Sequence, residues 1–248
     1  MPVAVEAQGV YKFHGQGSER VPILREISFS VQSGEFVCVM GPSGSGKSTL
    51  LHLLSGLDKP SAGTVQLAGQ DLAQLSERRR TLQRREQVGY VFQFFNLMPN
   101  LSVQENIALP VAIAGHGLAA AARTRVTTLA ERLGLAARLE ALPHQLSGGE
   151  MQRTSIARAL MGNQPLLLCD EPTGNLSQKA GAEVMEILRG CCDEDGRSVL
   201  LVTHNPRDAA FADRVLFLVD GELAQDAELR GPGLTVDEIH EALKDLSI

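Results

Sequence analysis

The segment FVCVMGPSGSGKS, residues 36–48, decides the fold of this 248-residue chain. Its first part, Phe36–Met40, is a continuous apolar run, which is typical of a strand covered on both faces of a parallel sheet. The glycines that follow let backbone N–H groups curl around a phosphate, Lys47 is placed to reach outer phosphates, and the Ser48 hydroxyl suits Mg²⁺. A helix-prone stretch, Thr49–Leu57, comes next, so the context favours a nucleotide-binding loop. The expected nucleotide contacts are Gly41, Pro42, Ser43, Gly44, Ser45, Gly46, Lys47, Ser48 and Thr49.

Further short apolar runs alternate with helical stretches along the chain. They lie at Val88–Phe92, Leu166–Cys169 and Val199–Val202, and this alternation predicts an α/β fold with a mainly parallel sheet. The stretch Leu101–Pro143 has no strand pattern and contains the strongly helix-favouring segment Ala119–Leu133, so we expect a helical lobe inserted into the α/β core. Near the end, Leu234–Leu246 has apolar residues close to helical spacing and is predicted to form an amphipathic helix.

Polar side chains follow several of these strands at the point where each strand ends. Asp170 and Glu171 come directly after Leu166–Cys169, at the edge of a parallel sheet where ligands bind. Asp170 is suited to support Mg²⁺, and Glu171 to polarise a water against a γ-phosphate as a general base. The alternative is a pair of exposed carboxylates. Gln93 and His204 also follow strands; alone each is usually structural, but here Gln93 suits Mg²⁺ and the attacking water, and His204 the γ-phosphate.

The segment LSGGE, Leu146–Glu150, is a second candidate for phosphate contact. It suits the start of a helix, where unpaired N–H groups and partial positive charge favour anions. A plain loop before a helix is the alternative.

In this order, the motifs resemble those of the ATP-binding subunits of ATP-binding-cassette (ABC) transporters. Gly41–Ser48 corresponds to Walker A, Gln93 to the Q-loop, Leu146–Glu150 to the signature, Asp170-Glu171 to Walker B with its catalytic glutamate, and His204 to the switch histidine. The resemblance covers nearly the whole chain. It implies a P-loop NTPase core, with a mixed but mainly parallel sheet, an N-terminal antiparallel β region and an inserted helical subdomain. Residues 1–95 and 150–225 would form the core, about 96–149 the subdomain, and 226–248 a C-terminal tail.

The resemblance also implies a mechanism and partners. ATP would be hydrolysed with Mg²⁺ held by Ser48, Gln93 and Asp170. Two subunits would pair head-to-tail, so that Ser147, Gly148 and Gly149 of one subunit cap the ATP of the other. A membrane permease would place a cytoplasmic helix in a groove formed by the helical lobe and Phe94–Met98. The alternative for that apolar stretch is that it belongs to the core of the lobe.

Three segments resemble one branch of the family, the ATPases of lipoprotein release, macrolide export, antimicrobial-peptide export and cell division. These segments are Gly89–Leu97, Glu105–Pro110 and Glu171–Leu176. Two functions follow. In the first, the chain drives export or extraction of a lipoprotein, peptide or amphiphilic compound. In the second, it signals without cargo through a permease-like partner to cell-wall or division enzymes.

The chain departs from the family pattern at two places. Ser177 stands where the family has an aspartate at the dimer seam, which predicts weaker coupling of the two ATP sites. The alternative is that Ser177 simply caps the next helix, since serine is a good N-cap. The tyrosine that stacks on adenine is also missing: register points to His14, with Phe13 or Tyr11 as alternatives.

Composition narrows the function classes. The formal net charge of −6 argues against a general nucleic-acid binder, which usually carries a basic footprint. The cluster of arginines at positions 78–80 and 84–85 is interleaved with acidic residues, so it predicts a solvated helix face, with an anionic membrane surface as a second use. Cys38 and Cys169 lie in apolar runs and are expected to be buried thiols in a reducing compartment. No signal peptide and no apolar run of about 18 residues is evident, so we expect a cytoplasmic protein. The resemblance to ABC transporter subunits implies that it is peripheral on the inner face of the cell membrane.

Overall fold

In the computed structural model, residues 2–15, 20–115, 120–231 and 233–246 are described. Their centre is a seven-stranded sheet in which β3, the strand predicted before the phosphate loop, lies between β9 and β8. The pairs β9–β3, β3–β8, β8–β7 and β7–β6 are parallel, while β10 and β11 pair with β9 in the antiparallel sense. The strands are β3 (Phe36–Met40), β6 (Val88–Val91), β7 (Leu166–Asp170), β8 (Ser198–Thr203), β9 (Arg214–Val219), β10 (Glu222–Leu223) and β11 (Leu229–Arg230).

A second, antiparallel sheet packs beside the first and confirms the expected N-terminal β region. Its order is β2-β1-β4-β5. Its buried side chains, among them Val10, Leu24 and Ile27, join Val37 and Val39 of β3 in one hydrophobic core. The strands are β1 (Val3–His14), β2 (Val21–Gln32), β4 (Ala62–Leu67) and β5 (Gln70–Asp71).

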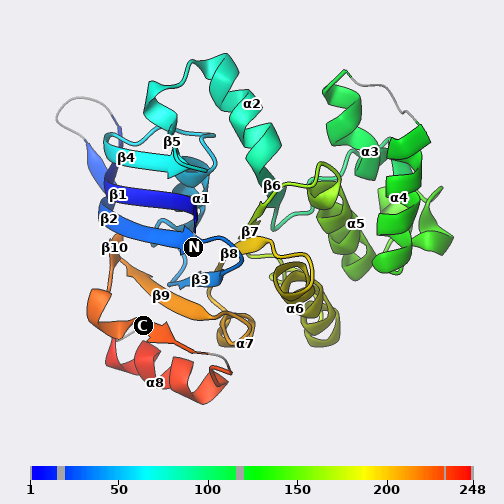
Figure 1. The fold of residues 1–248 in the computed structure, drawn as a ribbon. Coiled ribbons are helices and arrows are strands. Elements are labelled where there is room, and N and C mark those ends of the chain that lie inside the picture. Colours follow the sequence, from blue (N-terminus) through cyan, green and yellow to red (C-terminus); the bar gives the residue numbers. More distant parts are fainter. Residues whose placement is uncertain (1, 16–19, 116–119, 232, 247–248) are drawn as a thin grey trace.

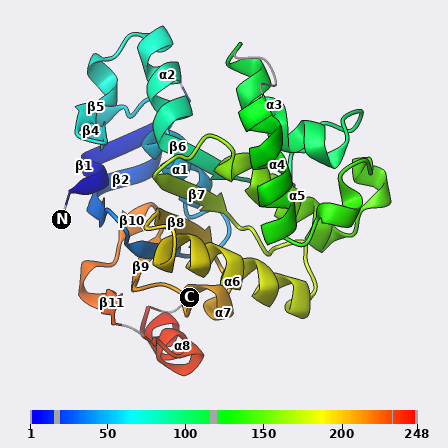
Figure 2. The ribbon, with the colours of Figure 1, turned by 45° about the vertical axis from the view of Figure 1, so that its right-hand side comes forward.

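Alternate residues of β3 enter different cores, which explains why the strand is apolar throughout. Val37 and Val39 pack with helix α1, whereas Phe36, Cys38 and Met40 pack in a second core with residues of α5 and α6. Helices therefore cover both faces of the parallel sheet (Figure 2). The helices are α1 (Lys47–Leu54), α2 (Glu77–Gln87), α3 (Val103–Ile113), α4 (Ala120–Arg132), α5 (Gly148–Leu160), α6 (Gln178–Asp193), α7 (Pro206–Ala209) and α8 (Val236–Asp245).

Helices α3, α4 and α5 lie together as a lobe beside the two sheets (Figure 1). Ile107, Val126 and Ile156, one from each helix, share a hydrophobic core. The boundary expected between residues 149 and 150 falls inside α5, because α5 packs as one continuous helix. The predicted helix at 119–133 corresponds to α4; residue 119 lies outside the described residues.

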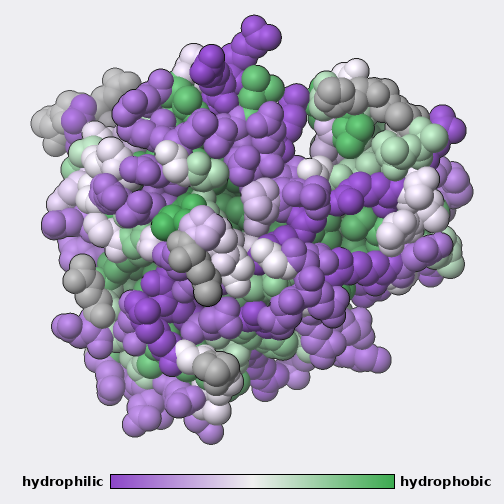
Figure 3. Space-filling model, in the orientation of Figure 1, coloured by the Kyte–Doolittle hydropathy of each residue, from purple (hydrophilic) through white to green (hydrophobic). Residues whose placement is uncertain are grey.

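The helices predicted at Thr49–Leu57 and Leu234–Leu246 are both present, and they differ from the observed helices only at their ends. Helix α1 begins at Lys47, inside the phosphate-loop motif, and is followed by Gly56, whose φ of 69° ends the helix. The predicted terminal helix is α8, which begins at a capping box formed by Thr235 and Glu238. Within the described ranges, no helix combines the length and apolarity that crossing a membrane requires. The face seen in Figure 3 is mainly hydrophilic, with hydrophobic residues in small separate areas.

Candidate nucleotide site

The phosphate loop joins β3 to α1 and has a backbone that only glycine adopts easily. Gly44 and Gly46 have φ angles of 85° and 105°, in the left-handed region. A β-carbon on Gly46 would lie 2.7 Å from the Leu24 side chain, whereas one on Gly44 would meet no atom within 4 Å. The loop is therefore packed against β2 at Gly46 and open at Gly44, which leaves room for a ligand.

The N-terminus of α1 has the features of an anion site. It starts at Gly46 with no side-chain cap and no acidic residue in its first turn. In contrast, the starts of α3, α5 and α8 are each closed by a capping box. Because the N–H groups of α1 lack a side-chain partner and carry partial positive charge, they fit a phosphate. The Ser45 hydroxyl, buried without a hydrogen-bond partner, adds a donor in the same loop.

Lys47 lies across the loop and is almost completely buried. Its Nζ donates hydrogen bonds to the carbonyl oxygens of Gly41 at 2.8 Å and Pro42 at 2.9 Å. The same nitrogen is 3.7 Å from Oε1 of Glu171. Lys47 therefore links the loop to the end of β7 and places a positive charge between them.

Glu171 is the point where three predicted site residues meet. Besides Lys47, Gln93 Nε2 donates to its Oε2 at 3.2 Å, and His204 Nδ1 lies 3.1 Å from its Oε1. The backbone N–H of Glu171 bonds the Val202 carbonyl at 2.9 Å and so extends the β7–β8 pairing by one residue. Its φ of 42° is unusual for a residue with a side chain, and such strain often accompanies functional sites.

Ser48 and Asp170 form an oxygen pair beside this cluster. Ser48 Oγ donates to Asp170 Oδ1 at 3.0 Å. Burial raises the pKa of Asp170, and the nearby charge of Glu171 acts in the same direction, while the Ser48 hydrogen bond lowers it. Oxygen ligands of this kind suit Mg²⁺, which keeps waters and phosphate oxygens in its shell. The described residues contain no cluster of three or more His, Cys, Asp or Glu that could hold a metal ion.

The signature segment begins helix α5. The Ser147 hydroxyl donates to Glu150 Oε2 at 2.8 Å and accepts from the Glu150 N–H at 3.3 Å. The hydrogen bond from the Ser147 N–H to the carboxylate, together with those from the Ser147 hydroxyl and Arg138, lowers the pKa of Glu150 to about 2. Ser147 is exposed and Gly148 half-buried, whereas Gly149 is buried against Ala180 of α6. Ser147 is therefore the member of the motif that faces solvent.

Ser177 caps helix α6, as the simpler sequence interpretation predicts. Its hydroxyl accepts from the Ala180 N–H at 3.4 Å. Asn175, two residues earlier, donates to the Gln93 carbonyl at 3.0 Å. The loop between β7 and α6 is thereby tied to the Gln93 segment within one subunit.

The three candidates for adenine stacking lie along β1. Tyr11 stacks on Phe13 with ring centroids 6.3 Å apart and donates its hydroxyl to Glu26 at 3.3 Å. His14 is exposed at the end of the strand, opposite Val21. Because β2 continues from Val21 to Leu24 beside the phosphate loop, the end of β1 lies on the same side of the molecule. Assignment of His14 to adenine stays a prediction.

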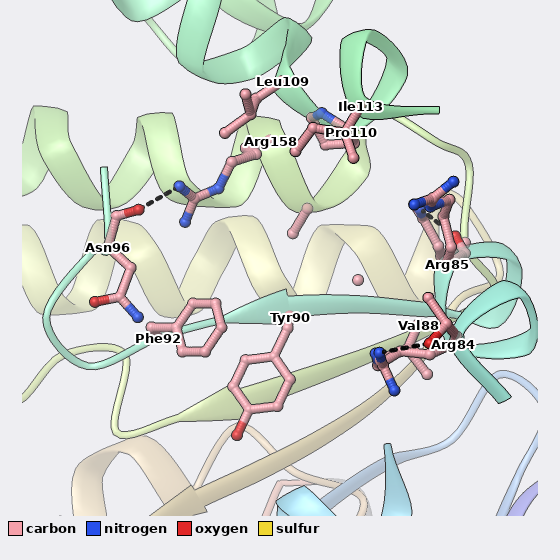
Figure 4. A pocket seen from close by; sticks show the side chains of 14 residues that line it. Arg84, Arg85, Val88, Tyr90, Phe92, Asn96, Leu109, Pro110, Ile113 and Arg158 are labelled. Carbon is pink, nitrogen blue, oxygen red and sulfur yellow. Dashed lines mark hydrogen bonds between the residues drawn. The ribbon is translucent and has the colours of Figure 1, made fainter. Parts of the chain in front are cut away.

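A groove of about 440 Å³ lies between the helical lobe and the β6 side of the core (Figure 4). Of the apolar stretch predicted to form it, only Asn96 lines the groove; Phe94 is 70% exposed and Phe95 is half-buried. The sequence interpretation missed its other wall. The other residues that line the groove include Arg84, Arg85, Tyr90, Pro110, Ile113 and Arg158.

The prediction of a solvated arginine face is wrong for part of α2. Arg80 is buried and pairs with Glu77, while Arg84 donates to the Gly56 carbonyl at 3.0 Å. Arg84 and Arg85 are half-buried, and both line the groove. Alternating charges in a sequence do not reveal which side of a helix packs on the core, so this error was not avoidable from pattern alone.

Cys38 and Cys169 are buried free thiols, as the sequence predicts. Cys191 and Cys192, for which the sequence analysis makes no burial prediction, are buried free thiols as well. Burial raises the pKa of the Cys191 and Cys192 thiols to about 11, so they remain protonated at neutral pH.

Comparison with known proteins identifies relatives across most of the chain. The family described as ABC transporter matches residues 24–174. The lipoprotein-releasing system ATP-binding protein LolD of Shewanella sp. (strain MR-4) is 44% identical over 226 residues, which cover 91% of this chain and 97% of the relative. The pyoverdine export ATP-binding/permease protein PvdT of Pseudomonas aeruginosa is 46% identical over 216 residues, covering 87% of this chain. The macrolide export ATP-binding/permease protein MacB of Photorhabdus laumondii is 41% identical over 227 residues, covering 92% of this chain.

The chain spans only about a third of the last two relatives, 32% of PvdT and 35% of MacB. Among solved structures, one similar chain is an ATP-binding cassette described as a dimer in a post-hydrolysis state bound to ADP and Pi. It superposes with a TM-score of 0.84 at 38% identity, covering 93% of this chain and 100% of that one.

Proposed function

Since this chain belongs to the ABC transporter family and is an ATP-hydrolysing cassette, we propose that it powers a permease that exports or extracts a lipoprotein, peptide or other amphiphilic compound. The observation that carries this proposal is the 44% identity to a lipoprotein-releasing ATPase along 97% of that protein. The names of the exporters reported above support transport over cargo-free signalling. The protein would then work at the inner face of the cell membrane, docked on its permease.

Reconstitution tests this function. The chain and its permease, purified as a complex and placed in vesicles, should hydrolyse ATP faster when a lipoprotein or amphiphilic cargo is added. Cargo release should stop when ATP is replaced by ADP. If no amphiphile stimulates ATP hydrolysis, and the same complex activates a cell-wall hydrolase in the presence of ATP, the result would support signalling instead.

The chain's own residues suit each part of ATP hydrolysis. The N–H groups of α1 and the Lys47 ammonium bind phosphates, and the side chain of His14 is proposed to stack on adenine. Ser48, Asp170 and Gln93 are the residues that would hold Mg²⁺, which when bound neutralises phosphate charge. Glu171 accepts the proton of the attacking water, because its carboxylate lies among Lys47, Gln93 and His204. His204 is proposed to contact the γ-phosphate as well as Glu171.

We propose that the active site is completed by a second copy of the chain. Ser147 is exposed at the start of α5, so its hydroxyl can meet an ATP bound to another subunit. A head-to-tail pair with two-fold symmetry would place Ser147, Gly148 and Gly149 of each copy over the partner's phosphates. The similar solved cassette, described as dimeric with ADP and Pi, supports this arrangement.

Ser177→Asp tests whether the serine weakens coupling at the proposed seam. Aspartate also caps helices, so α6 should be kept, and it restores the charge that the family has at this position. ATP turnover in the permease complex is expected to be preserved or to rise. Ser177→Ala, which removes the cap alone, is the matched control. A clear drop in turnover with Ser177→Asp would show that the serine is adapted to this chain.

The groove beside the helical lobe is proposed as the site for a cytoplasmic helix of the permease. Its walls combine apolar side chains, Tyr90, Pro110 and Ile113, with the guanidinium groups of Arg84 and Arg85 (Figure 4). Ile113 is 63% exposed, so it offers apolar surface to a partner. This charge pattern favours a short amphipathic helix that carries an acidic side chain at the α2 end of the groove.

Arg85→Glu is expected to weaken permease binding by about tenfold or more, because it replaces attraction with repulsion at a half-buried site. ATP hydrolysis by the chain without permease should not change. Arg79→Glu, on an exposed position of the same helix, is the control. Affinity is measured by capture of the chain on permease-containing vesicles. Equal binding by the parent chain and both variants would refute this docking site.

A further inference from the structure

Asp208, a residue outside every motif considered above, is a buried carboxylate on the short helix α7. It is only 4% exposed. Its Oδ2 accepts hydrogen bonds from the hydroxyls of Thr173 and, at 3.3 Å, Thr203, and its Oδ1 accepts from Asn205 Nδ2 at 3.0 Å. Burial raises the pKa of Asp208, while these three donors lower it. Burying a carboxylate without hydrogen-bond donors costs free energy of folding. The bonds to Asp208 therefore fix the positions of both the carboxylate and its three donors.

The three donors lie close in sequence to Glu171 and His204, which contact each other at the candidate γ-phosphate site. Thr173 is two residues after Glu171, while Thr203 and Asn205 stand on either side of His204. Asp208 therefore joins the segment after β7 to the segment after β8. Glu171 and His204 themselves meet at 3.1 Å, and the Asp208 bonds form a second link between the same two segments.

Close packing does not hold the Thr173–Ser177 loop on its α7 side. A cavity of about 350 Å³ lies there, bordered by Thr173, Ser177, Asn205 and Asp208. Leu176 packs on the hydrophobic core, and individual hydrogen bonds hold the rest of the loop, among them the Asn175 bond to the Gln93 carbonyl and the Thr173 bond to Asp208. Loss of the carboxylate would free this loop and the His204 segment to move apart.

We propose that Asp208 is a positioning residue that holds Glu171 and His204 in the geometry needed for hydrolysis and ties both to the Ser177 loop at the subunit seam. The inference rests on the proposed roles of Glu171 and His204. It assigns Asp208 no contact with ATP. Its removal should therefore change turnover and leave nucleotide affinity almost unchanged.

Asp208→Ala tests the inference through a split between kcat and binding. We expect kcat for ATP hydrolysis to fall by roughly 10–100-fold, as for small displacements of catalytic groups, with ATP affinity by calorimetry changed by less than about threefold. Asp208→Asn keeps one acceptor oxygen for the two threonines and should recover part of the loss. Thr173→Val removes a single donor at nearly constant shape and should lower kcat by a smaller factor.

Asp213→Ala is the matched control, because Asp213 is a carboxylate that bonds the Phe36 N–H and Arg189 far from His204. It should lower the melting temperature and keep kcat. Parent kcat in a folded Asp208→Ala protein would overturn the inference. The inference would also be overturned if kcat fell in proportion to the melting temperature in both Asp208→Ala and Asp213→Ala, while Thr173→Val kept the parent kcat. If Glu171→Gln, assayed in parallel, keeps hydrolysis, the catalytic assignment itself fails; if only Asp208→Ala keeps it, the positioning role alone fails.

Discussion

Glu171→Gln is expected to lower ATP hydrolysis by roughly 10²–10⁴-fold and to leave ATP binding intact, the loss typical when a general base is removed. Glutamine has nearly the same shape and can still bond Gln93 and His204, which lie 3.2 Å and 3.1 Å from the carboxylate oxygens. It cannot accept the proton of the attacking water. Without the negative charge beside Lys47, phosphate binding should not weaken, and an ATP-bound pair of subunits should accumulate.

Release of phosphate, followed with the chain saturated by ATP and Mg²⁺, measures this effect. Glu194→Gln is the control, since Glu194, which directly follows the C-terminal end of α6, forms an exposed ion pair with Arg132 of α4. It should hydrolyse ATP at the parent rate. Parent-rate hydrolysis by Glu171→Gln would show that another group is the base.

Lys47→Ala is expected to weaken ATP binding by a factor on the order of 10²–10³, the range for losing one partner of a buried charge pair. Lys47 is 5% exposed and carries the positive charge of the loop. Its hydrogen bonds to the Gly41 and Pro42 carbonyls also shape the loop, so alanine removes both charge and support.

Calorimetric titration with ATP measures the change, and thermal unfolding shows whether the protein remains folded. Lys244→Ala, an exposed lysine on α8, should bind ATP like the parent. Unchanged affinity in folded Lys47→Ala protein would contradict the assignment of the phosphate loop.

The sequence predicts most of the fold around the site, because the decisive features are local. Phe36–Ser48 contains a strand, a glycine-shaped loop and a helix start in one segment, and the structure has all three. Glu171, Gln93 and His204 are far apart in sequence, but each follows a strand of one sheet. Since parallel strands place their carboxyl ends at a common edge, the contacts among these residues follow from topology.

Residues whose roles depend on packing between distant segments were not predictable. Asp208 lies 35 positions from Thr173, and nothing in its local sequence indicates that it accepts a bond from that loop. Its place four residues after His204 was the one available signal. Arg84 and Arg85 belong to a groove whose other wall comes from α3 and α5, so their charge pattern alone suggested solvent.

The proposal that each ATP site needs residues from two copies of the chain is tested most directly by the molecular mass of the Glu171→Gln protein in solution. Light scattering on a sizing column, with ATP at saturating concentration, should give twice the 26.6 kDa of one chain. With Ser147→Arg added, which places a bulky side chain at the proposed seam, the mass should return to that of one chain. A mass of one chain for Glu171→Gln with ATP bound, or a dimer that Ser147→Arg leaves intact, would contradict the shared site.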